Sequence, residues 1–192
     1  MCQKRRWSWA GMRTDAVEVL DTAIPVLAKD RGASMQVIAR RAGISRATLT
    51  RLFPTRQVLV QAMAAKILDD CDRALTPAET GPEFSPTLLA GLLEQYVPFA
   101  QLWTLVYVEP DVLGAPEASE QAEKIFTRTV AIMAAGQAAG VLRADMPPTW
   151  LASTFCGLAE TAWELTVEGH MGTRQAPGFL TEILHHGLTA TP

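Results

Sequence analysis

The chain has 192 residues, of which 48% are hydrophobic, and it carries a formal net charge of −3. A chain of this length can bury a core of one or two domains, so it needs neither disulfides nor metals to fold. No apolar run reaches the roughly 20 residues of a membrane-spanning helix. The basic N-terminus is not followed by the apolar segment of a signal peptide, so we expect a cytoplasmic protein.

The charges are divided unevenly along the chain. Residues 1–66 hold twelve Lys and Arg against four acidic residues, a balance of +8, whereas residues 67–192 hold five basic against sixteen acidic residues, a balance of −11. This split predicts an anionic partner for the N-terminal part. A solvated basic face without a partner is the alternative.

The first predicted element is a helix over residues 14–29. Thr14 is a suitable N-cap, and Asp15 and Glu18 follow in the first turn, where acidic side chains interact favourably with the helix dipole. Pro25 is expected to kink this helix or to shift its hydrogen bonding. One buried face is predicted by the helical spacing of Val17, Leu20, Ile24 and Leu27.

Three further helices are predicted, each with a polar cap. Ser34 opens the second, which ends at Gly43, a residue type that accepts positive φ without strain. Ser45 caps the third, RATLTRLF, which Pro54 stops. Thr55 caps a longer fourth helix, RQVLVQAMAAKILDDCDRAL.

Two short helices joined by a turn with a glycine are typical of a helix-turn-helix. In the third helix Leu49 and Phe53 face the core, which leaves arginines, threonines and Ala47 on the exposed side. Such a face can enter the major groove of DNA, where arginine donates to guanine and a small residue permits close approach. Its positive charge also releases counterions from the duplex.

This order of motifs resembles the tetracycline-repressor (TetR) family of transcriptional regulators. The resemblance is carried by IARRAGISRATLTRLFPTRQVLVQAM, with the preceding helix and the Ser34 cap. It implies an all-α homodimer with a DNA-binding domain at residues 14–66 and a helical domain at residues 67–192 that binds a small-molecule effector and dimerises. The implied function is that of a ligand-responsive regulator, a repressor that leaves a pseudo-palindromic operator when the effector binds.

The family pattern also marks residues that are expected to touch DNA. They are Ser34, Ser45, Arg46, Ala47, Thr48, Thr50, Arg51 and, as a phosphate contact, Arg56. The sequence departs from the family where Thr50 replaces a tyrosine, Leu52 a histidine and Gln57 a glutamate. The first two departures change frequent DNA contacts, so operator sequence and affinity do not follow from the family. The basic residues 1–13 are expected as an arm on the DNA or as a disordered tail.

The second part of the chain is predicted to be helical, with proline and glycine between the helices. The expected ranges are 85–107 with a break near Pro98, 117–140, 147–169 and 176–189. A stripe suited to helix pairing runs along the third of these helices, and we expect it to form a four-helix dimer interface with the last helix. The expected interface residues are Leu151, Phe155, Leu158, Ala162, Leu165, Leu180, Ile183 and Leu184. An intrachain core is the alternative.

A cavity for the effector is expected to be lined by bulky apolar side chains with a few polar ones. The candidates are Tyr96, Phe99, Trp103, Tyr107, Phe126, Met133, Phe155 and Trp163. Glu160 or Glu164 are candidates to orient a cation or a hydrogen-bond donor. Simple core packing is the alternative for each apolar residue.

The three histidines and three cysteines form no catalytic or metal-ligand spacing, and the glycines form no phosphate-binding loop. We therefore expect no enzyme, catalytic residue, metal or cofactor. The expected partners are double-stranded DNA, a small-molecule effector and a second copy of the chain, with no membrane. The alternative function is a dimeric small-molecule-binding module of the same fold without sequence-specific DNA binding, which the departures at Thr50 and Leu52 suggest.

Overall fold

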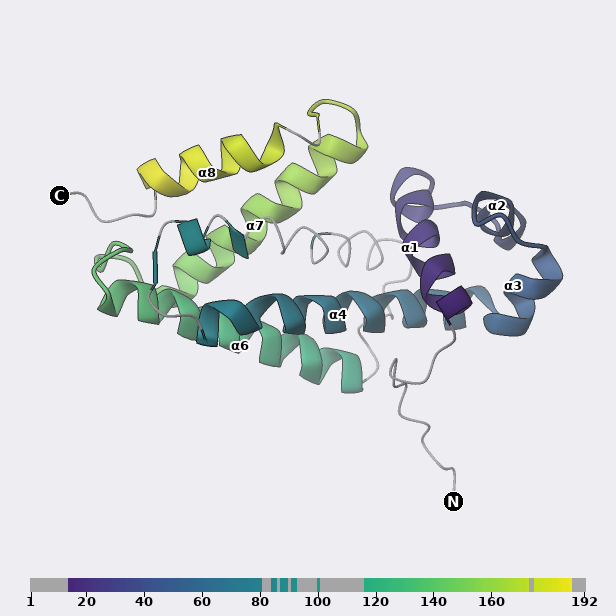
Figure 1. Ribbon diagram of the computed structural model, residues 1–192, viewed down its shortest axis with the longest axis horizontal. Helices are drawn as coiled ribbons and strands as arrows, with labels where there is room; N and C mark the ends of the chain where they lie inside the picture. The colour runs from purple at the N-terminus through teal and green to yellow at the C-terminus, as the bar shows by residue number, and fades with distance from the viewer. Residues whose placement is uncertain are drawn as a thin grey trace, which may run out of the picture.

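The computed structural model describes residues 14–80, 84–85, 87–89, 91–92, 100, 116–172 and 175–187, and no strand occurs among them. The all-α fold class predicted from the sequence is confirmed. Figure 1 labels the helices α1 (Thr14–Lys29), α2 (Met35–Arg41), α3 (Arg46–Leu52), α4 (Arg56–Thr80), α6 (Pro116–Ala138), α7 (Pro148–Val167) and α8 (Ala176–Gly187).

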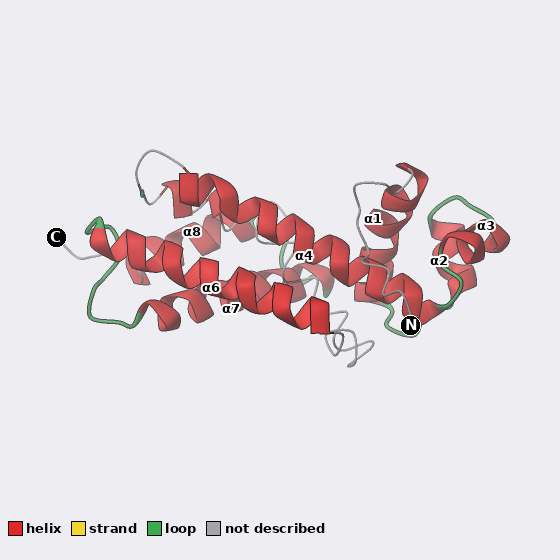
Figure 2. Ribbon diagram, turned by 90° about the horizontal axis from the view of Figure 1, so that it is seen from below, coloured by secondary structure: helices red, strands yellow, loops and turns green. Residues whose placement is uncertain are grey.

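The helices form two groups that α4 joins. Helices α1, α2 and α3 pack together at one end of the molecule, and α4 runs from this head along α6 (Figures 1 and 2). Helix α7 packs on α6, and α8 packs on α7. The predicted domain boundary at residue 66 falls inside α4, so the division into residues 14–66 and 67–192 stays a prediction and cuts through one helix.

Helix α1 has the predicted bounds, and Pro25 does not end it. The ring of a proline removes one backbone donor and crowds the carbonyl four residues earlier. Pro25 lies on the exposed side of α1, where water can bind that carbonyl, whereas Leu20, Ile24 and Leu27 lie in the core. Three of the four residues of the predicted apolar face are therefore buried in spite of the proline, and the fourth, Val17, is half-buried.

One apolar core connects the two groups of helices. It includes Leu20 of α1, Phe53 after α3, Met63 of α4 and Phe155 of α7, none of which is more than 1% exposed. Burial of a large apolar side chain contributes about 1.5–3 kcal/mol. Apolar packing therefore holds α4 at both of its ends, and the position of the head depends on a helix that also belongs to the second group.

Helix α4 is longer than predicted. It passes through Pro77 and ends at Thr80, whereas the sequence predicted an end at Leu75. Glu79, in the last turn, accepts hydrogen bonds from Arg128 of α6, and these hold the turn against its neighbour. The local sequence carries no signal of this contact, because the two residues are 49 positions apart.

Helices α6, α7 and α8 begin within one residue of their predicted starts and end two residues before their predicted ends. Gly140 and Gly169, with φ of 72° and 80°, follow α6 and α7 and allow the chain to turn there. The helix predicted over residues 85–107 lies mostly outside the described residues. None of the helices described here is long and apolar enough to cross a membrane.

Candidate functional site

Helices α2 and α3 begin at the two predicted serine caps. Ser34 Oγ accepts the backbone N–H of Val37 at 3.4 Å, and Ser45 Oγ accepts that of Thr48 at 3.0 Å. Between the helices Gly43 has a φ of 68°, which residues with a Cβ atom rarely adopt. The helix-turn-helix predicted from the sequence is therefore present, and glycine is required at its turn.

The exposed face of α3 carries Arg46, Ala47, Thr50 and Arg51. Leu49 points the other way and is 0% exposed, so rotation of α3 would expose a core side chain. Neither α2 (MQVIARR) nor α3 (RATLTRL) contains an acidic residue, so no carboxylate of these two helices neutralises their arginines. The arrangement is a rigid, positively charged helix face of the width that fits a major groove.

Besides the capping serines, two further predicted DNA contacts have partners within the chain. Thr48 is half-buried, and its hydroxyl lies 2.9 Å from Ser45 Oγ, so it takes part in the cap of α3. Arg56 is half-buried as well, and it donates from Nη1 to the carbonyl of Ala33 and from Nη2 to that of Arg31. Sequence reasoning missed both intrachain roles.

The predicted effector-binding residues have different environments. Tyr96, Phe99, Trp103 and Tyr107 lie outside the described residues. Phe126 and Trp163 are half-buried, whereas Met133 and Phe155 are 0% exposed. Met133 and Phe155 belong to the apolar core, and their contact with an effector stays a prediction.

Glu160 of α7 is a half-buried carboxyl group. Burial raises its pKa, and the charge of Glu164, one turn further on, raises it again. No cation or hydrogen-bond donor from the described part of the chain offsets these two effects. Glu160 is therefore a carboxylate that a bound cation would stabilise.

The predicted dimerisation stripe of α7 lies mostly inside the chain. Leu151, Phe155 and Ala162 are at most 4% exposed in a single chain, where they pack in the apolar core. For these three residues the structure shows the intrachain packing that was the alternative, and a contact with a partner subunit stays a prediction. Leu158 is half-buried, whereas Leu165 is 36% exposed and lies on the outer side.

Four large apolar side chains of the packed helices α7 and α8 are exposed. They are Trp150, Leu165, Phe179 and Ile183, which are 61%, 36%, 55% and 48% exposed, and we refer to them together as the α7–α8 apolar face. Exposed large apolar side chains on two adjacent helices indicate an interaction surface. The side chains of Leu180 and Leu184 lie outside the described residues.

A lysine connects α4 to α1. Lys66 Nζ lies 2.7 Å from Asp21 of α1 and 2.8 Å from Asp70 of its own helix. Burial acts to lower the pKa of Lys66, but the hydrogen bonds to both aspartates outweigh it, and the pKa is raised. The lysine therefore stays charged and ties the head to the long helix.

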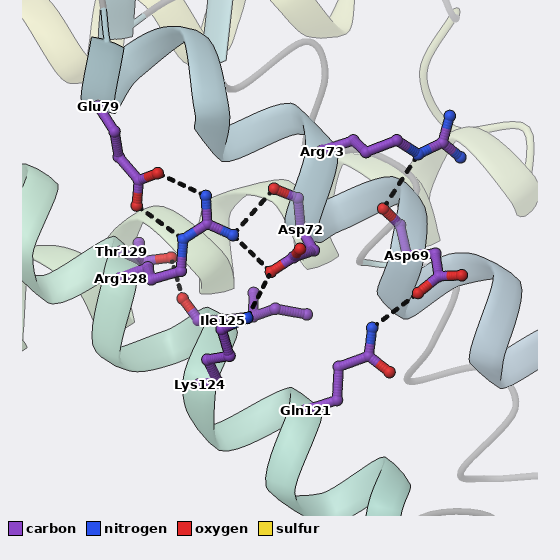
Figure 3. A network of polar contacts seen from close by, with 9 residues as sticks. All are labelled: Asp69, Asp72, Arg73, Glu79, Gln121, Lys124, Ile125, Arg128 and Thr129. Atoms are coloured by element: carbon purple, nitrogen blue, oxygen red, sulfur yellow. Dashed lines mark hydrogen bonds and ion pairs between the residues drawn. The ribbon is translucent and has the colours of Figure 1, made fainter. Parts of the chain in front are cut away.

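An arginine connects α4 to α6 (Figure 3). Arg128 donates to Glu79 from Nε at 2.7 Å and from Nη2 at 2.5 Å, and its Nη1 donates to the carbonyl and the carboxylate of Asp72. About two turns before Arg128 on α6, Gln121 donates to Asp69 of α4 at 2.9 Å. The acidic residues of α4 were visible in the sequence, but their partners were not.

These features define a class of protein. A basic helix-turn-helix at one end of a long helix, with a separate helical bundle at the other end, is the architecture of a DNA-binding regulator whose second part receives another signal. Comparisons with known proteins show which members of this class the chain is similar to.

Residues 20–63 match the model of the bacterial regulatory proteins of the tetR family. The HTH-type transcriptional repressor LfrR of Mycolicibacterium smegmatis is 27% identical over 174 residues, which cover 91% of this chain and 90% of LfrR. The crystal structure of LfrR in complex with proflavine has a TM-score of 0.69 and 26% identity and covers 93% of this chain and 99% of that one. The TetR regulator SCO0520 from Streptomyces coelicolor has a TM-score of 0.63 and 25% identity over 92% of this chain and 99% of its own. The chain is therefore similar along most of its length to transcriptional regulators of the tetR family.

Proposed function

We propose that the protein is a homodimeric transcriptional repressor that binds a pseudo-palindromic operator and leaves it when a small-molecule effector binds. The exposed basic face of α3 is the observation that carries this proposal. The relative LfrR is a transcriptional repressor, which supports repression as the output. A dimer places two such helices in successive major grooves, so we expect half-sites about 34 Å apart.

Within this proposal the residues of the helix-turn-helix have different roles in DNA binding. Arg46, Thr50 and Arg51 read base edges, and Ala47 permits close approach. The remaining candidates, which lie at the starts of helices, are Ser34, Ser45, Thr48 and Arg56. We expect Arg51→Ala to weaken operator binding by about 1–3 kcal/mol and to relax the preference at one base pair. If this variant binds the operator with the affinity and specificity of the unmodified protein, α3 is not the recognition helix.

For the dimer we propose the α7–α8 apolar face as the contact between two copies of the chain. A core of Trp150, Phe179 and Ile183 would remove large apolar side chains from water, which is the main driving force of a permanent interface. Ile183→Glu should sediment as a folded monomer. Thr127→Glu, at an exposed position of α6, is the matched control and should stay dimeric. A dimeric Ile183→Glu would place the interface elsewhere.

For the effector we propose an aromatic organic cation. Glu160 offers a half-buried carboxylate that no cation among the described residues offsets, and Trp163 lies on the same helix. The crystallised relative LfrR holds proflavine, an aromatic cation. We expect proflavine to bind, and Glu160→Gln to weaken it at least about tenfold, the equivalent of ~1.4 kcal/mol. Glu120→Gln, an exposed position of α6, is the control, and equal binding by both variants would exclude Glu160.

The experiment that tests the function is selection of binding sites from random duplex DNA, followed by binding of the best site over a salt series. We expect an enriched pseudo-palindrome and a steep loss of affinity with salt, because phosphate contacts release counterions. Proflavine should then release the protein from this site, since an effector that prefers the free form must weaken DNA binding by the same free energy. A folded dimer that enriches no sequence would instead support the small-molecule-binding module.

A further inference from the structure

Arg56 has an unusual position for a residue expected to hold a DNA phosphate. It is the first residue of α4, yet its guanidinium reaches back to the loop between α1 and α2. Nη1 lies 2.5 Å from the carbonyl oxygen of Ala33, and Nη2 lies 2.6 Å from that of Arg31. Each terminal nitrogen therefore uses one of its two N–H groups for a backbone carbonyl, and the two carbonyls stand two residues apart.

The loop that Arg56 holds is already well ordered on its other side. The carboxylate of Asp30 accepts a hydrogen bond from the backbone N–H of Gly32 at 3.0 Å. The backbone carbonyl of Asp30 accepts one from the N–H of Ala33 at 2.9 Å. Ala33 is 2% exposed and packs in the core, and Ser34, the cap of α2, follows it directly. A displacement of this loop would therefore displace the first turn of α2.

The start of α4 is in turn fixed relative to α3. Only Phe53, Pro54 and Thr55 separate the two helices, and Phe53 is 1% exposed in the core. Thr55 Oγ1 accepts the N–H of Val58 and caps α4. Arg56, at the start of α4 and close to the end of α3, thus holds the loop before α2, so one side chain sets the distance between the two ends of the helix-turn-helix.

We propose that Arg56 is a positioning residue of the DNA-binding surface, which acts by fixing Ser34 and α2 relative to α3 and not by binding a phosphate itself. The inference rests on the proposed DNA-binding function. Arginine is required because a planar guanidinium presents two donors in a fixed fork. A lysine at this position keeps the charge, but its single nitrogen cannot hold both carbonyls in the same way.

The two roles make different predictions for the conservative variant Arg56→Lys. A phosphate contact needs only a charge, so Arg56→Lys would bind the selected operator like the unmodified protein. A positioning role needs the fork, so Arg56→Lys should lose about tenfold in affinity, as expected for a hydrogen bond worth ~1.4 kcal/mol. The salt dependence should stay unchanged in Arg56→Ala, whereas loss of a phosphate contact would reduce the slope by about 0.9.

The experiment measures binding of the selected operator by Arg56→Lys and Arg56→Ala over a salt series, with Arg73→Lys as the matched control. Arg73 is an exposed arginine of the same helix, away from the head, and its variant should bind normally. The expected result is a similar loss for both Arg56 variants with the slope of the unmodified protein. Normal affinity of Arg56→Lys, or a reduced slope in Arg56→Ala, would overturn the proposal.

A double-mutant cycle separates positioning from general loss of stability. If Arg56 acts through Ser34, then Ser34→Ala should cost less in the Arg56→Lys background than in the unmodified protein. Hydrogen exchange of the backbone amides of Val37 and Ile38 should also be faster in Arg56→Lys than in the unmodified protein. This increase should be larger than the increase for amides of α4. Additive losses in the cycle, or uniform acceleration of exchange, would contradict the proposal. If the unmodified protein selects no DNA sequence, it is the proposed function that fails, and the exchange measurement still tests the contact.

Discussion

Arg128 of α6 holds both carboxylate oxygens of Glu79 on α4, from Nε at 2.7 Å and from Nη2 at 2.5 Å. The Arg128 side chain is 19% exposed and that of Glu79 is 34% exposed, so the pair is partly removed from water. An exposed ion pair contributes little, but a bidentate one with low exposure is stronger and more directional. This pair therefore fixes how α4 lies against α6.

We expect Arg128→Ala to lower the free energy of unfolding by about 1–3 kcal/mol, because charge-assisted hydrogen bonds to Asp72 and Glu79 are lost. Urea unfolding followed by circular dichroism measures this. Arg73→Ala is the matched control, since the Arg73 side chain is 75% exposed, and it should change stability by less than about 0.5 kcal/mol. Equal effects of the two substitutions would contradict the role assigned to Arg128.

The same pair predicts a pH dependence. The hydrogen bond from Arg128 lowers the pKa of Glu79 below its ordinary value of 4.5. A carboxyl group with a depressed pKa stabilises the fold above the unfolded value, and this contribution is lost as the pH falls through the folded value. The melting temperature of the unmodified protein should therefore exceed that of Glu79→Gln from pH 7 to about pH 5. The difference should shrink below pH 4.5, and a difference that grows on acidification would be the opposite of what this geometry requires.

Gly136 of α6 occupies a position with no room for a side chain. A Cβ atom there would lie 2.7 Å from the ring of Phe84 and 2.8 Å from Leu142 Cδ1. We expect Gly136→Ala to destabilise the protein by about 1–3 kcal/mol through overpacking. Gly91→Ala is the control, because a Cβ atom at that helical position meets nothing within 4 Å, and alanine there should be neutral or favourable. The melting temperatures of the two variants test this, and equal melting temperatures would contradict the close packing at Gly136.

Cys71 of α4 should be unreactive in the native protein. It is 0% exposed, and burial, with a smaller effect of the Asp70 charge, raises the pKa of its thiol. Because the thiolate is the reactive form, alkylation by iodoacetamide at pH 8 should occur only after unfolding. Half-buried Cys156 is the internal comparison and should react first. Peptide mass spectrometry measures both sites, and alkylation of Cys71 at the denatured rate under native conditions would exclude this burial.

The head could be predicted from the sequence because its signals are local. Ser34 and Ser45 cap helices that follow them directly, and Gly43 has the positive φ expected of a helix end. Leu49 lies in the core, as its spacing predicted. Each of these features depends on residues a few positions apart, so a single sequence contains the information.

The partners of Arg56 and of α7 could not be predicted in the same way. Arg56 bonds to carbonyls 23 and 25 residues away, and backbone carbonyls leave no mark on a sequence. On α7 the apolar residues cover more than one side, and the spacing of Leu151, Phe155 and Ala162 suits an internal neighbour as well as a partner subunit. Only the packed structure shows that these three face inward while Trp150 does not.

The continuity of α4 has a consequence for recombining such proteins. A straight helix advances about 1.5 Å and turns about 100° with each residue. One residue inserted between Lys66, which binds the head, and Asp72, which binds α6, would turn the two groups against each other by more than a quarter of a circle. A chimaera that joins this head to the second group of helices of another regulator must therefore keep the same rotation along the connecting helix. Its length at the junction can change only by numbers of residues close to whole helical turns.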